Sequence, residues 1–221
     1  MASKRYDHST GRDGTENRRF DPHSIYAPGI DLKLIRVPSN DWEWIYVACE
    51  KGHPCPYCGR MDRYSNCIFI AVDGACRGNG TSQAKASIGV FVGPISPYNQ
   101  SVLLHEPHVT NKIAELKAGI LALELATEIQ RTNTLGEELI KVVIKSDSEH
   151  LVKGMTEWVF KWEINGYKTA KREPVKNAGL FKRLQELVSD LDSVNVEMLF
   201  WHVPREMNTD ADGLANQAFN S

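Results

Sequence analysis

The sequence predicts an α/β protein in which a mixed sheet of five strands is flanked by helices. Short apolar runs, such as residues 68–73 and 141–146, have the length and composition of buried strands. Residues 111–132 place apolar side chains at helical spacing, which is typical of a long, deeply packed helix. Strand and helix patterns follow one another in the order βββαβααβα, and such alternation is typical of layered α/β folds.

The first 67 residues differ in character from the rest of the chain. Residues 1–29 are polar and lack periodicity, so we expect a disordered or loosely attached tail. Residues 30–49 contain two β-rich stretches separated by the turn residues Pro38 to Asp41, which predicts two short strands. A cysteine-bearing loop follows them. We therefore expect residues 30–67 to form a small extension of a domain that covers residues 68–221.

That domain begins with three strand patterns, IFIAVDG (68–74), AKASIGVFVG (84–93) and SVLLHEP (101–107). Consecutive strands joined by short turns pair most simply as antiparallel neighbours. The long helix follows, and then IKVVIKSD (140–147) predicts a fourth strand. Two helices are expected around residues 149–164 and 177–191, with a basic, turn-like segment between them. VNVEMLFWHV (194–203) predicts the last strand and NTDADGLANQAFN (208–220) the closing helix.

The composition is ordinary for a soluble globular protein, with 42% apolar and 24% charged residues. No segment approaches the roughly 18 consecutive apolar residues of a membrane-spanning helix. The N-terminal residues lack the apolar core of a secretory signal, so we expect a cytoplasmic or nuclear monomer without membrane contact. Acidic residues near the N-terminus argue weakly against a mitochondrial presequence, but they do not exclude a mitochondrial location. The net charge of −2 does not by itself indicate a nucleic-acid binder.

Three acidic residues lie where α/β proteins usually place their chemistry. Asp73 and Asp147 end the first and fourth strands of the domain, and Glu115 lies one turn into the long helix. Each also has a structural interpretation, as a turn former or as a charge that complements the helix dipole. If the two strands are neighbours, their aspartates repel each other, and both stay ionised only when a cation shares the space. A few carboxylates and a phosphate suffice to hold Mg²⁺.

The residues around these acids form four motifs, DGACRGNG (73–80), TNKIAE (110–115), SDS (146–148) and NTDADGLA (208–215). Together with the basic segment 162–177, which looks like a handle loop, they closely resemble the type 1 ribonuclease H family. The resemblance covers the chain from Ile68 to the C-terminus. It implies an endonuclease that cleaves the RNA strand of an RNA–DNA hybrid with two Mg²⁺ ions, or Mn²⁺ in their place.

The resemblance also implies roles for particular residues. The family's four catalytic, metal-binding carboxylates correspond to Asp73, Glu115, Asp147 and Asp212. Asp210 is a rival for the last place, but the family's aspartate is followed by any residue and then Leu-Ala, which selects Asp212. Asp210 would then stabilise the N-terminus of the closing helix.

Further positions resemble those that contact the hybrid. Asn79 and Asn111 match residues near the RNA backbone, where side-chain amides offer both donors and acceptors. Thr110 and Asn177 resemble a pocket for a DNA phosphate, and Tyr167 stands where an aromatic residue packs on a DNA sugar. The remaining basic positions of the handle would attract phosphates, namely Lys168, Lys171, Arg172 and Lys176. Without the resemblance, this basic run could equally be a solvated helix face.

The chain departs from the family pattern near the active site. Many members carry a mobile His in a loop before the last helix, whereas this chain has the shorter segment 203–208, with Arg205 or Glu206 in that space. No general base is assigned for this reason. A basic residue of the family two positions before Thr110 is replaced by His108.

Five cysteines lie between Cys49 and Cys76, and an odd number without a secretory signal argues against a disulfide framework. The Cys55-Pro-Tyr-Cys58-Gly segment resembles a zinc knuckle. Cys49 and Cys67 could complete four zinc ligands, with His53 as a substitute. The alternative is a reduced, metal-free loop. Cys76 is expected to be a small buried residue.

Two other functions remain open from the sequence. The chain could be a catalytically silent nucleic-acid-binding module of the same fold, although all four carboxylates are present. It could also be a nuclease of the same superfamily that acts on structured DNA. The handle loop and the paired asparagines favour the hybrid nuclease.

Overall fold

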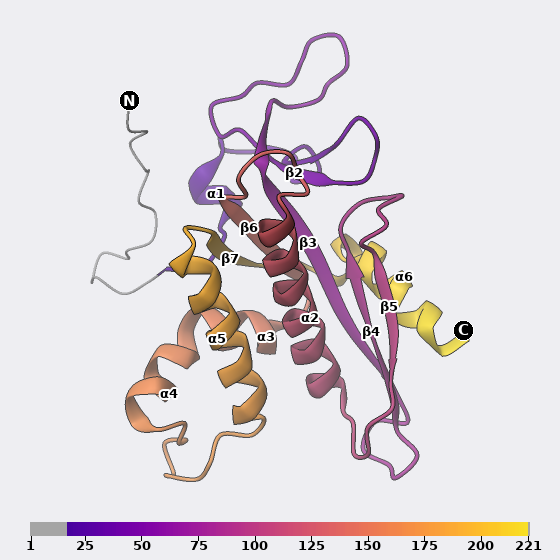
Figure 1. The fold of residues 1–221 in the computed structure, drawn as a ribbon, viewed down its shortest axis with the longest axis vertical. Helices are drawn as coiled ribbons and strands as arrows, with labels where there is room; N and C mark the ends of the chain where they lie inside the picture. The colour runs from indigo at the N-terminus through magenta and orange to yellow at the C-terminus, as the bar shows by residue number, and fades with distance from the viewer. Residues whose placement is uncertain (1–16, 221) are drawn as a thin grey trace.

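Seven strands form one mixed sheet in the computed structural model, which describes residues 17–220 (Figure 1). The long strand β3 (Arg63–Arg77) lies at its centre. Antiparallel β4 (Lys85–Phe91) and parallel β6 (Lys141–Ser146) pair with its two edges. Antiparallel β5 (Gln100–Leu104) pairs with β4, and parallel β7 (Glu197–His202) pairs with β6. The predicted α/β architecture is confirmed.

The predicted count of five strands is wrong, because the N-terminal extension adds two strands to the same sheet. They are β1 (Arg36–Pro38) and β2 (Ile45–Ala48), which pair as an antiparallel ribbon. β2 pairs with the first part of β3, and the Ile45 N–H donates to the Val92 carbonyl at 3.0 Å, so this ribbon continues the sheet beyond the end of β4. β3 starts at residue 63, within a polar stretch in which no strand is expected from the sequence.

The helices follow the predicted order. The long helix α2 (Asn111–Thr132) starts where Thr110 caps it, with the Thr110 hydroxyl accepting from the Ile113 N–H, and it ends at a left-handed Asn133. After β6 come α3 (Glu149–Lys153), a π-helical turn, α4 (Val159–Asn165) and α5 (Ala178–Ser193). A 3₁₀ turn and α6 (Thr209–Gln217) follow β7, and a short helix, α1 (Pro22–Ile25), precedes the sheet.

The two faces of the sheet are covered by different parts of the chain. Ile68, Ile70 and Val72 of β3 face the larger apolar cluster, which also contains buried side chains of α2 and α5. The alternate residues Cys67 and Phe69 face a second apolar cluster. We call this second group the N-terminal cluster. Its buried members are Phe20, Tyr26, Ile35, Val37, Ile45, Val47, Ala48, Met61, Cys67, Phe69, Val143, Leu199, Trp201 and Val203.

Residues 17–29 are attached to the sheet, which corrects the expectation of a loose tail for this part of residues 1–29. The Phe20 N–H donates to the Phe200 carbonyl at 2.9 Å, and the Phe200 N–H donates to the Arg18 carbonyl at 2.7 Å. The side chains of Phe20 and Tyr26 are buried. The expectation for residues 1–16 lies outside the described residues. No helix among residues 17–220 is long and apolar enough to cross a lipid bilayer.

Candidate active site

Two glycines let helices approach the sheet closely enough to bring acidic side chains together. A Cβ atom on Gly74 of β3 would lie 2.3 Å from the backbone nitrogen of Glu115 in α2. A Cβ atom on Gly89 of β4 would lie 2.3 Å from the carbonyl oxygen of Ala211 in α6. No side chain fits at these distances, so each glycine is required by a close backbone contact. The two contacts hold α2 and α6 against the sheet beside Asp73.

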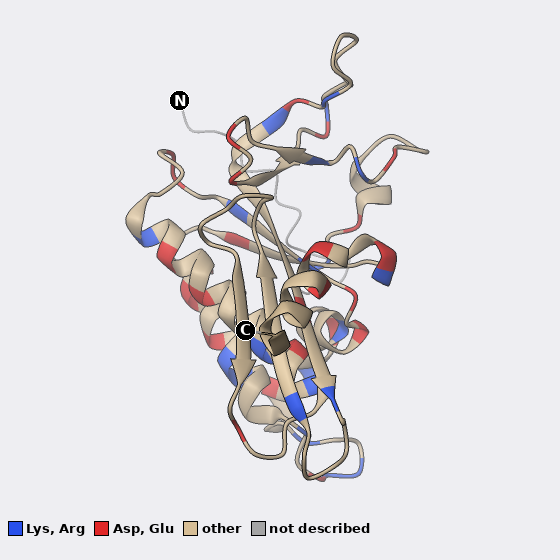
Figure 2. Cartoon of the chain, turned by 90° about the vertical axis from the view of Figure 1, so that its right-hand side faces the viewer, with Lys and Arg blue, Asp and Glu red and all other residues tan. Residues whose placement is uncertain are grey.

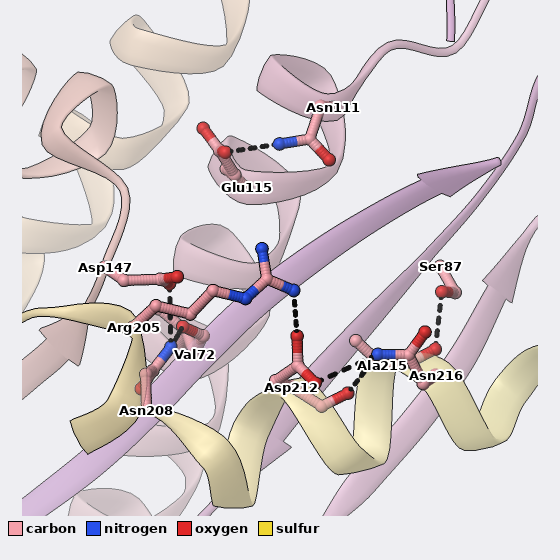
Figure 3. Close-up of polar contacts among 10 residues, drawn as sticks. All are labelled: Val72, Ser87, Asn111, Glu115, Asp147, Arg205, Asn208, Asp212, Ala215 and Asn216. Atoms are coloured by element: carbon pink, nitrogen blue, oxygen red, sulfur yellow. Dashed lines mark hydrogen bonds and ion pairs between the residues drawn. The ribbon is translucent and has the colours of Figure 1, made fainter. Parts of the chain in front are cut away.

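The structure brings the four predicted carboxylates into one neighbourhood. Asp73, Glu115 and Asp147 line a cavity of about 250 Å³ between the last five residues of β3, the end of β6 and the start of α2. Asp212 of α6 adjoins it, since its Oδ2 accepts from Nδ2 of Asn216, another residue that lines the cavity. Figure 3 shows three of these acids, Glu115, Asp147 and Asp212, on separate elements around a common space. Neither Asp210 nor Asp212 lines the cavity itself, but Asp212 contacts two residues that do, Arg205 and Asn216.

Neighbouring polar side chains fix the orientation of two of these acids. Glu115 accepts from Nδ2 of Asn111 at 2.6 Å and from the Ser148 hydroxyl at 2.5 Å. Asp147 accepts from Nδ2 of Asn208 at 3.0 Å (Figure 3). Asn208 is fully buried and donates also to the Val72 carbonyl at 2.9 Å. It therefore ties the start of α6 to both β3 and Asp147.

Asp73 and Glu115 lie in an environment that disfavours their charge. Burial raises the pKa of Asp73 to about 7, and the nearby charges of Asp147 and Asp212 contribute to this rise. Burial also raises the pKa of Glu115 above its ordinary value. Carboxylates arranged in this way gain from a cation placed between them. Oxygen donors of this kind suit Mg²⁺ or Mn²⁺, so the residues present fit the metals that the sequence predicts.

Arg205 supplies a positive charge to this site. Its guanidinium donates to Oδ1 of Asp212 at 2.5 Å, and Figure 3 shows the side chain extending between Asp147 and Asp212. The charge of Asp212, with smaller effects of Asp73 and Asp147, raises the pKa of Arg205. As these side chains lie, no three His, Cys, Asp or Glu residues among 17–220 converge on a common metal position.

The stability of the protein is expected to fall as pH rises through the pKa of Asp73, and Mg²⁺ is expected to offset this loss. The folded state keeps the Asp73 proton up to about pH 7, whereas an unfolded chain loses it near 3.8. The stability that this proton contributes is fully present below about pH 4 and is lost as pH rises through about 7. Mg²⁺ should therefore raise the melting temperature more at pH 8 than at pH 5.5.

The control for this prediction is Asp73→Asn, which cannot ionise at this position. Its Mg²⁺-dependent rise in melting temperature should be small at both pH values. An equal rise at pH 5.5 and pH 8 in the unaltered protein would contradict the prediction.

The predicted substrate-binding residues lie on one side of this cavity and on the handle loop. Oδ1 of Asn79 accepts from the Asn111 N–H at 3.3 Å, so the glycine-bearing loop touches the start of α2. Asn177 precedes α5 in a left-handed conformation, and its buried Nδ2 has no hydrogen-bond partner in the described part of the chain. Tyr167 is buried, and the Lys182 ammonium lies 4.9 Å from the centre of its ring. Thr110 caps α2.

The basic positions of the handle are exposed. The loop between α4 and α5 turns back on itself, with a bridge between Lys168 and Pro174. Figure 2 shows blue basic positions along this loop at the lower end of the molecule. All four predicted phosphate-binding side chains are open to solvent there, namely Lys168, Lys171, Arg172 and Lys176.

The four cysteines of the predicted zinc site lie on different parts of the N-terminal extension and β3. Cys67 lies on β3 with only 3% of its surface exposed and faces the N-terminal cluster. Cys49 lies beside the Tyr64 hydroxyl, with its thiol 3.4 Å from that oxygen. Cys55 and Cys58 belong to a separate turn, closed by the Gly59 N–H and the Cys55 carbonyl at 2.8 Å. No three such side chains converge among residues 17–220, and the four cysteines are free thiols there, so the zinc site stays a prediction.

The model of the RNase H family matches residues 65–220 of this sequence. The chain belongs to the RNase H family. Its matched region contains the four acids, the asparagines and the handle loop, whereas most of the N-terminal extension precedes it.

Individual members of the family and one solved structure are similar to this chain in sequence or in fold. A Ribonuclease H of Schizosaccharomyces pombe is 39% identical over 185 residues, which are 84% of this chain and 60% of the relative. A Ribonuclease H of Pseudomonas savastanoi pv. phaseolicola is 34% identical over 153 residues, 69% of this chain and 93% of the relative. A foamy viral protease-reverse transcriptase solved with dsDNA has a TM-score of 0.54 and 22% identity, covering 68% of this chain and 92% of that one. This last likeness shows the RNase H fold alone.

Some residues of the site were not assigned roles from the sequence. Asn208 lies within a family motif, and its burial beside two acids is visible only in the structure. Gly89 interrupts a predicted strand, and an isolated glycine in a strand is a signal of close backbone approach. The contact of Arg205 with Asp212 joins residues on the two sides of a turn, and no sequence pattern indicates it.

Proposed function

We propose that this RNase H family member is an endonuclease that hydrolyses the RNA strand of RNA–DNA hybrids with two divalent metal ions. The observation that carries the proposal is the cavity where Asp73, Glu115 and Asp147 meet, with Asp212 beside it. Because these acids are close together and Asp73 is buried, a bound cation would stabilise their ionised forms. Relatives that bear the name Ribonuclease H match most of the chain and support the choice of substrate.

In this proposal the chain's main task is to hold its oxygen ligands in place. Asp73 lies at the centre of the group and interacts with Asp147 and Asp212, so it is the candidate to bridge two ions. Asn111 and Ser148 orient Glu115. When bound, two divalent ions acidify the attacking water and neutralise charge on the departing 3′ oxygen. Mg²⁺ is the proposed cofactor, and Mn²⁺ satisfies the same donors.

The proposed substrate contacts follow the same surface. Asn79 and Asn111 lie side by side next to Glu115, where amide groups can read a ribose 2′-OH. The unpartnered Nδ2 of Asn177 supports a phosphate contact at the start of α5, because buried polar groups normally have a partner. Thr110 and Tyr167 are proposed to line the path of the DNA strand between the cavity and the handle.

Four labelled substrates test this function, namely an RNA–DNA hybrid, double-stranded RNA, duplex DNA and branched DNA. We expect cleavage of an RNA–DNA hybrid with Mg²⁺, no cleavage with EDTA, and no cleavage of double-stranded RNA or duplex DNA. Binding of the hybrid without cleavage would indicate a catalytically silent module. Cleavage of branched DNA but not of the hybrid would indicate a nuclease of structured DNA.

The handle is expected to contribute affinity rather than chemistry. Replacing Lys168, Lys171, Arg172 and Lys176 together with Ala should raise KM by about 10-fold or more with kcat nearly unchanged, because these side chains meet phosphates away from the reacting bond. The slope of log affinity against log salt should fall by about 1 for each basic side chain that no longer binds a phosphate. Binding and initial rates measured over a series of salt concentrations check both effects.

Lys33→Ala is the control for the handle, because Lys33 is an exposed lysine of the N-terminal extension. It should leave KM and the salt slope unchanged. A drop in kcat at unchanged KM in the handle variant would contradict the proposed role.

A further inference from the structure

An ion pair joins the N-terminal extension to the helix that carries Asp212. Nη2 of Arg36 on β1 lies 3.1 Å from Oδ2 of Asp210 in the first turn of α6. The Arg36 side chain is 19% exposed and the Asp210 side chain 41%. Arg36 precedes residues 65–220, which match the RNase H family, so the contact comes from outside the matched region.

The start of α6 is also attached to the sheet by the close contact of Gly89 with Ala211 and by two hydrogen-bonding side chains. The Lys145 ammonium donates to the Met207 carbonyl at 2.7 Å, and Lys145 is fully buried. The buried Asn208 amide donates to the Val72 carbonyl and to Asp147. These two contacts bind the backbone just before α6 to β3 and β6. The pair with Arg36, by contrast, is made by a side chain within the helix itself.

The charges of this region act on one another. The charges of Arg36 and Asp210 both act on the buried Lys145 ammonium. Lys145, Arg36 and Asp210 therefore form one charged group beneath the first turn of α6. Displacing Asp210 would leave the two cations next to each other with less compensation.

Helix geometry links this group to the active site. In an α-helix, residues at positions i and i+2 are separated by about 200° around the axis and about 3 Å along it. Asp210 and Asp212 therefore leave α6 on nearly opposite sides, one toward the extension and the other toward Arg205 and the cavity. Ser87 and Ser101 donate to the Ala215 and Leu214 carbonyls on the side of α6 that faces β4 and β5. The contact at Asp210 adds a restraint on the rotation of α6 about its axis, and this rotation decides where the Asp212 carboxylate lies.

We propose that Arg36 is a positioning residue for the active site, which sets the rotation of α6 through Asp210 and so presents Asp212 to the metals. The N-terminal extension is then part of the catalytic apparatus. This inference rests on the proposed metal-dependent function, in which ligands must lie within about 0.5 Å of their productive positions. A partly exposed ion pair contributes little to overall stability, so the effect of removing it is local.

Four variants test the proposal: Arg36→Ala, Arg36→Lys, Asp210→Asn and the double variant Arg36→Ala/Asp210→Asn. Arg36→Ala should lower kcat by about 10-fold to 100-fold and raise the Mg²⁺ concentration needed for half-maximal rate, with KM for the hybrid unchanged. Arg36→Lys, which keeps the charge, should restore part of the rate. The double variant should be no slower than Arg36→Ala, because both single changes break the same ion pair.

Hydrogen exchange of the metal-free protein gives a readout that needs no activity. Backbone amides of residues 209–213 should exchange several-fold faster in Arg36→Ala, while the melting temperature falls by no more than about 4 °C. The matched control is Arg19→Ala, which breaks another ion pair of the extension, with Glu157 at 3.4 Å. It should change neither the exchange of α6 nor kcat.

The outcomes separate this inference from the proposed function. Unchanged hydrogen exchange of residues 209–213 in Arg36→Ala would overturn the inference. It would also be overturned if Arg36→Ala had a lowered melting temperature but the same kcat and the same Mg²⁺ requirement as the unaltered protein. If the unaltered protein failed to cleave the hybrid, the proposed function would fail, and the exchange measurement would still decide whether Arg36 positions α6.

Discussion

Asp73→Asn should abolish hydrolysis of the RNA strand while leaving binding of the hybrid nearly intact. Asp73 is the acid whose pKa responds to both Asp147 and Asp212, so it lies at the centre of the proposed metal site. The amide keeps the shape of the side chain and removes the negative charge that a bridging ligand must supply. Metal ions provide several kcal/mol of transition-state stabilisation, and about 1.4 kcal/mol corresponds to each tenfold in rate. We therefore expect kcat to fall by about 1000-fold or more.

Binding and cleavage need separate measurements to check this result. Affinity for the hybrid should change by less than about threefold, because the phosphate contacts of the handle remain. Asp190→Asn, at an exposed position of α5, is the control and should behave like the unaltered protein. Cleavage by Asp73→Asn at a rate near normal would contradict the role of Asp73. A parallel loss of binding would indicate that the substitution disturbs the cavity rather than the chemistry.

The positions of the first three acids were predictable because they depend on local patterns. Asp147 directly follows β6, and Glu115 lies one turn into α2, as predicted. Asp73 does not end its strand, because β3 continues to Arg77 through its pairing with β4; it lies just beyond the last residue of β3 that pairs with β6. The assignment of Asp212 over Asp210 came from motif spacing. The structure places Asp212 beside the cavity and Asp210 beside Arg36, a difference that follows from the helix geometry of α6.

The contributions of the extension were not predictable, because they depend on contacts between distant segments. Residues 63–67 are polar and do not indicate a strand, yet they belong to β3, which pairs with β2. The spacing of Cys55 and Cys58 correctly indicates a tight turn. This spacing does not indicate which face of the sheet the Cys67 side chain occupies. That face is decided by the alternation of side chains along β3.

The same limit applies to residues 17–29. A single Phe20 among polar residues produces no periodicity, so the sequence alone favours a tail. In the structure its ring packs edge-on against Phe69 at 5.6 Å and Trp201 at 5.5 Å, measured between ring centres. Both partners lie on strands that are distant in sequence, so only the assembled sheet creates the site for Phe20.

Phe20→Ala is consequently expected to lower the free energy of unfolding by about 3–5 kcal/mol. The Phe20 side chain is only 3% exposed, and its removal leaves a cavity between two aromatic rings in the N-terminal cluster. Neighbouring side chains refill such a space only in part. Urea unfolding, followed by fluorescence and by circular dichroism, measures the change. A coincident transition in both signals would show that the extension and the sheet unfold together.

Tyr57→Ala is the matched control, since this aromatic side chain is 97% exposed and should contribute less than about 0.5 kcal/mol. If Phe20→Ala lowered the free energy of unfolding by less than about 1 kcal/mol, residues 17–29 would be only loosely attached. A large cost would mean that the extension is part of the folded domain. The distinction bears on catalysis, because Arg36 can hold α6 in place only if β1 is itself fixed to the sheet. The N-terminal cluster provides that attachment through Ile35 and Val37, the two neighbours of Arg36 in the chain.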